Sequence, residues 1–226
     1  MKNDAAPVTP RDRYLPLLQP FRAIMDSESF YYSIGLILVA LLFLGFGLAE
    51  LGKFITTDET VWLHVRVPQY WQALISGDIA RTEISLNPGI THSLLAGLTE
   101  FFIHLENYNP LTIEHYLFWW RIPGLFFNFL SLFIIYHFIR KLTDKNHALL
   151  ITGLIAFTPV ILGMSKIPNS DSQLWNTGFI AILTFLLYLR TNSYRYVVYC
   201  GIAFGLCLLC KFTATSLYLF FFTYLY

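Results

Sequence analysis

Two adjacent carboxylates, Asp58 and Glu59, stand shortly after the first long apolar run of this 226-residue chain. That run, Phe30 to Ala49, has 20 residues and no charge. An α-helix of this length crosses the hydrocarbon core of a bilayer. The sequence therefore places the two carboxylates at a boundary between membrane and water. A carboxylate that is partly desolvated there can act as a general base, because burial raises its pKa.

Three further charged residues, Arg121, Asp171 and Lys211, stand at or near the ends of later apolar runs. Cations in such places can hold an anion, and a carboxylate can accept hydrogen bonds from hydroxyl groups. The positions of these residues must be set by the helices that carry them. The apolar runs therefore decide whether the charges can meet.

The composition is that of an integral membrane protein. The chain is 56% hydrophobic and 13% charged, whereas soluble domains carry about 25% charged residues. A net charge of +1 gives no indication of a nucleic-acid partner. The six His residues are scattered without metal-ligand spacing, so we predict no metal site made by the protein itself.

We predict an all-α, polytopic membrane protein. Residues 1–28 would form a cytoplasmic tail, and residues 29–226 would form one transmembrane domain. The spans are predicted at about 30–50, 119–139, 148–163, 174–189, 196–210 and 212–226. Because the last apolar run has no polar flank after it, we interpret the chain as the N-terminal part of a longer protein.

Residues 53–118 form the loop between the first two predicted spans. Val61 to Ile75 has an amphipathic helical pattern. Ile90 to Leu105 has 16 residues and includes His92, Glu100 and His104. Ionisable residues are costly inside a bilayer, so this short stretch fits an interfacial or re-entrant helix better than a span.

The distribution of basic residues predicts the orientation. With the N-terminus in the cytoplasm and residues 88–105 not crossing, nine of the 15 Lys and Arg residues lie in the tail and two short cytoplasmic loops. This arrangement agrees with the positive-inside rule. All five charged residues singled out above would then lie on the outer side of the membrane.

Several motifs occur in a fixed order along the outer side. They are Asp58-Glu59 with Trp62 and Arg66, the stretch Trp71 to Asp78, Asn87-Pro88-Gly89, Arg121-Ile-Pro-Gly, the segment Ser165 to Asp171, and the Gly-rich helix from Gly205 to Lys211. Together they resemble GT-C membrane glycosyltransferases, in particular the protein O-mannosyltransferase and aminoarabinose-transferase superfamily. That family commonly has His where this chain has Asn87, although Asn can also cap the helix that follows.

The resemblance implies a GT-C helical bundle with amphipathic helices in the first outer loop. It also implies transfer of a sugar from a polyprenyl-phosphate-linked donor to a hydroxyl outside the cytoplasm, with inversion and no covalent sugar–enzyme intermediate. The acceptor would be a protein, a lipid or a glycan, and no cofactor beyond the lipid-linked donor is expected. The membrane would be a bacterial inner membrane or its equivalent.

Such a transfer needs a base for the acceptor proton, cations for the leaving phosphate, and a site that a lipid can reach from the side. Asp58 is the predicted base. Glu59 would orient the acceptor or the sugar, and Asp171 would bind acceptor or sugar hydroxyls. Arg121 and Lys211 are predicted to hold the phosphate.

Each of these residues also has a purely structural interpretation. Thr56-x-x-Glu59 is a capping box, and Asp58 would be favourable in any first helical turn. Asp171 could cap the helix that follows it. Arg121 could anchor its helix at the interface, and Lys211 could extend its amine to the lipid headgroups.

Two other classes of function stay open on the sequence alone. A transporter or flippase for a lipid-linked sugar would use the acidic pair as a proton or cation site. It would carry ionisable residues at mid-span, whereas here they gather at the outer ends of the helices, which favours the enzyme. A degenerate, non-catalytic membrane scaffold is the third class, and the presence of both Asp58 and Glu59 counts against it.

Overall fold

A computed structural model describes residues 28–85, 88–99 and 113–225, and every regular element in these ranges is a helix. The all-α prediction is confirmed for this part of the chain. Most of the predicted tail, Asn87, and the end of the predicted helix Ile90 to Leu105 lie outside the described residues, as does the side chain of Asp58.

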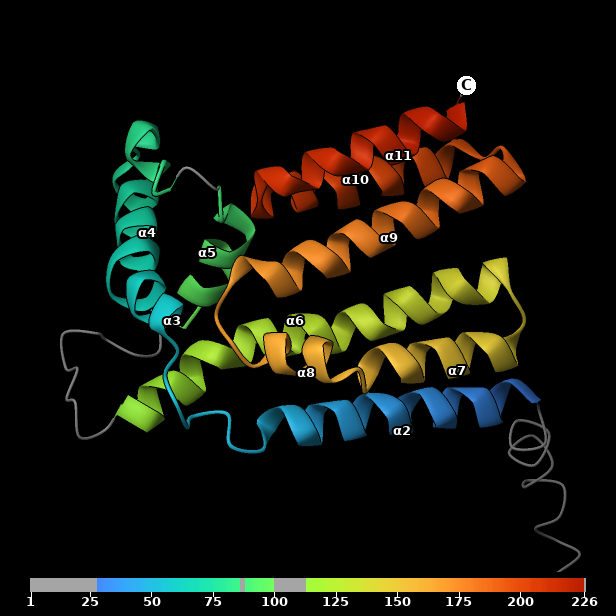
Figure 1. Cartoon of the computed structure of the whole chain (residues 1–226), viewed down its shortest axis with the longest axis horizontal. Coiled ribbons are helices and arrows are strands. Elements are labelled where there is room, and N and C mark those ends of the chain that lie inside the picture. The colour runs from blue at the N-terminus through green and yellow to red at the C-terminus, as the bar shows by residue number, and fades with distance from the viewer. Residues whose placement is uncertain (1–27, 86–87, 100–112, 226) are drawn as a thin grey trace, which may run out of the picture.

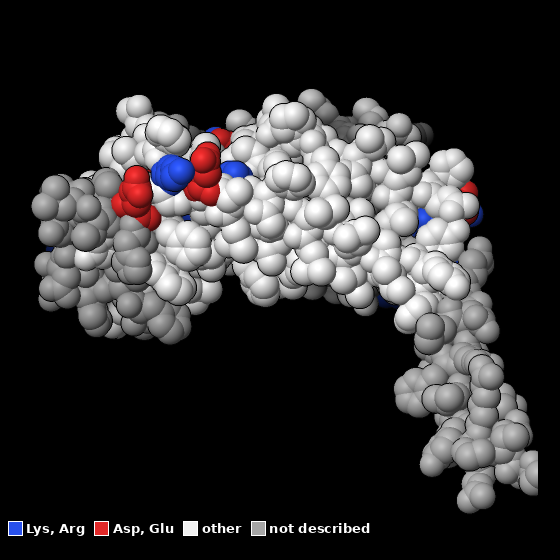
Figure 2. Space-filling model, turned by 90° about the horizontal axis from the view of Figure 1, so that it is seen from below, with Lys and Arg blue, Asp and Glu red and all other residues white. Residues whose placement is uncertain are grey.

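The body of the molecule consists of helices that mostly lie side by side (Figure 1). They are α2 (Glu28–Leu48), α6 (Ile113–Leu142), α7 (Lys145–Ala156), α8 (Pro159–Ser165), α9 (Ser170–Thr191), α10 (Tyr194–Cys210) and α11 (Ser216–Leu225), the last preceded by the 3₁₀ turn η5 (Phe212–Thr215). In length and composition α2, α6 and α9 could each cross a membrane, and α7 with α8 could form a fourth, bent span. Figure 2 shows one face with its charged side chains at the two ends and an uncharged band between them.

The third predicted span, residues 148–163, is interrupted in the structure. α7 ends at Ala156, and α8 begins at Pro159 with its axis bent by 62° from that of α7. Proline has no backbone N–H and cannot continue the hydrogen bonding of the preceding helix, but it suits the first turn of a new one. The bend directs the chain from α7 to the start of α9.

The segment between α2 and α6, which the sequence predicts to lie outside and which we call the outer segment, forms short helices at one end of the bundle, where α4 runs across the direction of the long helices (Figure 1). In order they are α3 (Thr57–Val61), the π-helical turn η1 (Trp62–Arg66), α4 (Val67–Ser76), the 3₁₀ turn η2 (Ile79–Thr82) and α5 (Ile90–Gly97). The helix predicted over Ile90 to Leu105 is shorter than expected, because α5 ends at Gly97. Its N-cap is Gly89, in the left-handed conformation with φ of 59°.

Two kinds of contact fix this outer segment in place. Within it, the indole N–H of Trp71 donates to the carbonyl of Ser93 at 2.8 Å. A Cβ atom at Gly97 would come within 1.5 Å of that indole nitrogen, so the helices pack this closely only around a glycine. Toward the bundle, the Gly89 N–H donates to the Cys210 carbonyl at 3.0 Å. The outer segment is therefore tied to the end of α10, next to Lys211.

Candidate functional site

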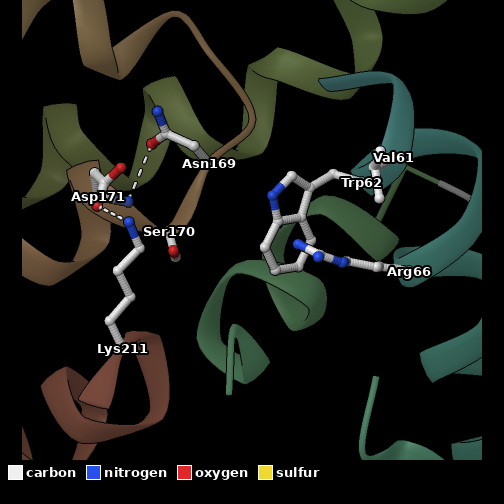
Figure 3. A pocket seen from close by; sticks show the side chains of 7 residues that line it. All are labelled: Val61, Trp62, Arg66, Asn169, Ser170, Asp171 and Lys211. Carbon is white, nitrogen blue, oxygen red and sulfur yellow. Dashed lines mark hydrogen bonds and ion pairs between the residues drawn. The ribbon is translucent and has the colours of Figure 1, made fainter. Parts of the chain in front are cut away.

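A cavity of about 220 Å³ lies between the outer segment and the ends of α9 and α10. One wall comes from α3 and η1, and the other comes from the start of α9 and the residue after α10 (Figure 3). The lining residues are Val61, Trp62, Arg66, Asn169, Ser170, Asp171 and Lys211. Two of the predicted site residues, Asp171 and Lys211, are thus brought together here from 40 positions apart in the sequence.

Asp171 and Lys211 form an ion pair at the edge of this cavity, in which Lys211 Nζ donates to Asp171 Oδ1. Their side chains are 32% and 28% exposed, respectively. Figure 3 shows the two side chains pointing toward each other from α9 and from the chain after α10. Either residue of a partly exposed ion pair can exchange its partner for a ligand, because solvent weakens the attraction between the two charges.

The sequence also allowed Asp171 to be the N-cap of α9, but a neighbouring residue has that role. Asn169 is the N-cap of α9, and its Oδ1 accepts from the N–H groups of Asp171 and Ser172. The carboxylate of Asp171 is therefore left available to Lys211 and to the cavity. Lys211 is itself the C-cap of α10, where the backbone turns extended, with φ of −153°.

The opposite wall is built on a π-helical turn. Such turns are rare and occur frequently at functional sites. Here Arg66 lies with its guanidinium carbon 4.8 Å from the centre of the Trp62 ring, and both residues line the cavity. A Cβ atom at Gly89 would lie 2.2 Å from the Trp62 ring, so glycine at this position makes room for the indole.

His92 packs against the indole of Trp62 and is not among the residues that line the cavity. Its ring meets Trp62 edge to face, with the ring centres 4.9 Å apart. His92 is buried, and neither ring nitrogen has a hydrogen-bond partner among the described residues. Burial lowers the pKa of His92 to about 3, so the imidazole is neutral at physiological pH.

Glu59 and Arg121 form a second ion pair, apart from the cavity. Arg121 Nε donates to Glu59 Oε1 and Arg121 Nη2 donates to Glu59 Oε2, both at 2.8 Å. The side chains are 0% and 4% exposed, respectively. Glu59 also accepts from the backbone N–H of Thr56 at 2.6 Å, which is one half of the predicted capping box.

All five N–H donors of the Arg121 guanidinium are in use. The three that do not reach Glu59 donate to backbone carbonyls of the segment before α3, those of Leu51, Lys53 and Phe54. No donor is left for a phosphate unless one of these bonds breaks. In this geometry the pair fixes the entry to α3.

Asp58 is the second residue of α3. Its backbone precedes Trp62 by four residues, about one helical turn. The helix that carries the predicted base thus leads directly into the wall of the cavity. Arg121, through Glu59, holds the start of this helix.

Sequence reasoning did not single out the whole lining. Trp62 and Arg66 belong to the motif around Asp58, and Asn169 and Ser170 lie within the segment Ser165 to Asp171, but the sequence alone assigns none of these four residues a role in a site. The spacing of four residues between Trp62 and Arg66 was the signal that both could face one side. Within the described residues, no group of three or more His, Cys, Asp or Glu side chains could hold a metal ion.

A family model described as "Dolichyl-phosphate-mannose-protein mannosyltransferase" matches residues 113–226. This range runs from α6 to the end of the described chain, so it includes Arg121, Asp171 and Lys211. No curated protein and no solved structure matches the chain.

Proposed function

Because the chain belongs to the dolichyl-phosphate-mannose-protein mannosyltransferase family, we propose that its cavity is where a lipid-linked sugar meets an acceptor hydroxyl. The family is one of multi-pass membrane glycosyltransferases with lipid-linked donors. The observation that carries the proposal is the Asp171–Lys211 pair, which lines a cavity at the end of the bundle beside the helix of Asp58.

In the proposed reaction Asp58 takes the proton of the acceptor hydroxyl. The acceptor oxygen attacks the anomeric carbon of the sugar, and the bond from that carbon to the phosphate oxygen breaks. The lipid phosphate leaves with the electron pair. A single displacement of this kind inverts the anomeric configuration.

The cations of the cavity have the right place to receive the leaving group. Lys211 is partly exposed at the edge of the cavity, and Arg66 faces it from the opposite wall. Fixed positive charge stabilises the negative charge that develops on a departing phosphate. Asp171 would orient Lys211 in the resting state and accept hydrogen bonds from sugar or acceptor hydroxyls when the phosphate draws Lys211 away.

Glu59 and Arg121 have a different role in this proposal from the one that the sequence suggested. They are positioning residues, because their hydrogen bonds are made to each other and to the segment that begins α3. Their contribution to catalysis is to hold the backbone that carries Asp58. Positioning of this kind is worth a great deal, since small misplacements of a reacting group cost large factors in rate.

The orientation and the acceptor are further parts of the proposal. Positive charge at the α6–α7 and α9–α10 connections supports a cytoplasmic position for that end of the bundle. The cavity then lies outside, in a bacterial inner membrane or its equivalent. The acceptor is a hydroxyl of a protein, a lipid or a glycan.

The test is a transfer assay with the full chain in membranes, using a polyprenyl-phosphate-linked sugar labelled in the sugar. Nuclear magnetic resonance of the first product gives its anomeric configuration. We expect inversion, and we expect Asp58→Asn to lower the transfer rate by about 10²–10⁴-fold, the usual contribution of a general base. Retention, or near-normal transfer by Asp58→Asn in a folded protein, would remove the proposed mechanism.

A further inference from the structure

A groove between α6 and α10 runs along the bundle from the end opposite the cavity, and the proposed reaction does not use it. Two adjoining hollows of about 370 and 270 Å³ share Ile134, Phe138 and Tyr199, so together they form one continuous depression, the α6–α10 groove. Most of its length is apolar and includes Phe127, Ile180, Ile202 and Leu206. Its end at the connections holds His137, Lys141 and Arg195.

The two cations of this groove have no carboxylate partner in the part of the chain that the structure describes. Among the described residues no Asp or Glu lies within ion-pair distance of Lys141 or Arg195. Both donate instead to the same phenol oxygen of Tyr196, at 3.3 and 3.2 Å. They also lie over the ring of that tyrosine, 5.5 and 4.8 Å from its centre. Two like charges held at one neutral group would be stabilised by an anion between them.

The hydroxyl groups along the apolar part of the groove already have hydrogen-bond acceptors within the protein. Ser131 and Thr177 each donate to a carbonyl of their own helix, those of Phe127 and Gln173. The remaining lining is hydrocarbon and aromatic. A matching ligand therefore has an anionic head and an apolar tail.

The length of the groove indicates which lipid leaflet supplies the ligand. From Arg195 to Leu206 the helix rises by about 16 Å, which is close to half of the roughly 30 Å hydrocarbon core. The basic end is at the start of α10, whereas Lys211 follows its last residue. A lipid whose head lies at Arg195 is thus at the opposite membrane face from the donor phosphate proposed above.

We propose that the α6–α10 groove binds one anionic phospholipid, with its phosphate between Lys141 and Arg195 and one acyl chain along Phe138, Ile202 and Leu206. Basic recesses between helices are typical sites for anionic headgroups. The site is separate from the sugar-transfer cavity, so its lipid is a resident of the opposite leaflet and is not consumed.

The test is native mass spectrometry of the full chain with phosphatidylglycerol or phosphatidylcholine added. We expect one retained phosphatidylglycerol, bound at least tenfold more tightly than phosphatidylcholine. Lys141→Gln with Arg195→Gln should weaken phosphatidylglycerol binding by about tenfold, while both side chains can still reach Tyr196. The matched control is Arg140→Gln with Lys145→Gln, which removes the same charge around the α6–α7 connection from residues that do not line the groove, and it should change binding by less than twofold.

A second variant tests the apolar length. Ala203 lines the groove and is almost fully buried, so Ala203→Phe should fill it and weaken phosphatidylglycerol binding with both cations intact. Unchanged binding by this variant would overturn the proposal. Three other results would also overturn it: no retained phosphatidylglycerol, equal losses in the two Gln pairs, or displacement of the lipid by polyprenyl phosphate.

Discussion

Within the described residues, two ion pairs are buried or half-buried, and they are chemically alike but structurally opposite. Glu59 and Arg121 are sealed from solvent, and every guanidinium donor has a protein acceptor. Asp171 and Lys211 are each about one third exposed and line a cavity. The difference teaches that a conspicuous charge at the end of a membrane helix can serve either architecture or chemistry, and that the count of its occupied hydrogen bonds tells which.

The Glu59–Arg121 pair, which we call the saturated pair because every guanidinium donor is used, should give the largest loss of stability when one partner is removed. Arg121→Met would leave the Glu59 carboxylate buried without a counter-charge and three backbone carbonyls without donors. Removing one partner of a buried pair costs about 3–5 kcal/mol, so we expect the variant to lose most of its folded yield. Thermal unfolding in detergent measures this loss.

The control for that experiment is Arg81→Met. Arg81 pairs with Asp78, but the two side chains are 79% and 43% exposed. Exposed pairs contribute about 0–1 kcal/mol, so this variant should unfold at nearly the wild-type temperature. An Arg121→Met protein as stable as the Arg81→Met protein would contradict the architectural role of the saturated pair.

The Asp171–Lys211 pair, which we call the open pair, should matter for the transfer rate more than for stability. Lys211→Met should leave the unfolding temperature within a few degrees of wild type but lower the transfer rate by about 10²–10³-fold, the usual effect of losing one fixed donor to developing charge. Single-turnover transfer from the lipid donor measures the rate. Adding Asp171→Asn to the Lys211→Met protein should recover part of the lost transfer rate, because the unpaired Asp171 carboxylate would otherwise repel the phosphate.

Much of this arrangement follows from the sequence, and the part that does not has a physical cause. Apolar length predicts the long helices, and a charge at each helix end predicts that Asp171 and Lys211 lie near one membrane face. Glu59, the partner of Arg121, lies 62 residues away in the sequence. The other acceptors of the Arg121 guanidinium are backbone carbonyls, which cannot be predicted from a pattern of side chains. The break at Pro159 follows from the missing backbone N–H of proline, which hydropathy does not measure, and the end of α5 at Gly97 depends on tertiary packing.

The wall of the cavity offers a pH test. The pKa of His92 is about 3 in the folded protein and 6.5 as a free side chain. Between these two pH values the His92 imidazole is protonated in the unfolded chain but not in the folded chain. The free energy of unfolding therefore falls as the pH drops from 6.5 toward 3. We expect wild type to lose about 1–2 kcal/mol more than His92→Leu between pH 7 and pH 5. Parallel curves for the two proteins, measured by thermal unfolding, would show that His92 is not held neutral.

The smallest effect is expected at Arg66. It faces the cavity from the π-helical turn, but its guanidinium already rests on Trp62 and it is only partly buried. Solvent weakens such a charge, so Arg66→Gln should raise the KM for the lipid donor by about three- to tenfold with little change in kcat. A large fall in kcat with KM unchanged would instead place Arg66 at the transition state.

The central claim is that the open pair, not the saturated one, receives the donor phosphate. The most direct test is the dissociation constant of polyprenyl phosphate without its sugar, measured with the full chain in detergent. Lys211→Met should bind at least tenfold more weakly than wild type, and Lys53→Met, which removes an exposed cation from the segment before α3, should bind within twofold of it. Wild-type affinity in a folded Lys211→Met protein would contradict the claim.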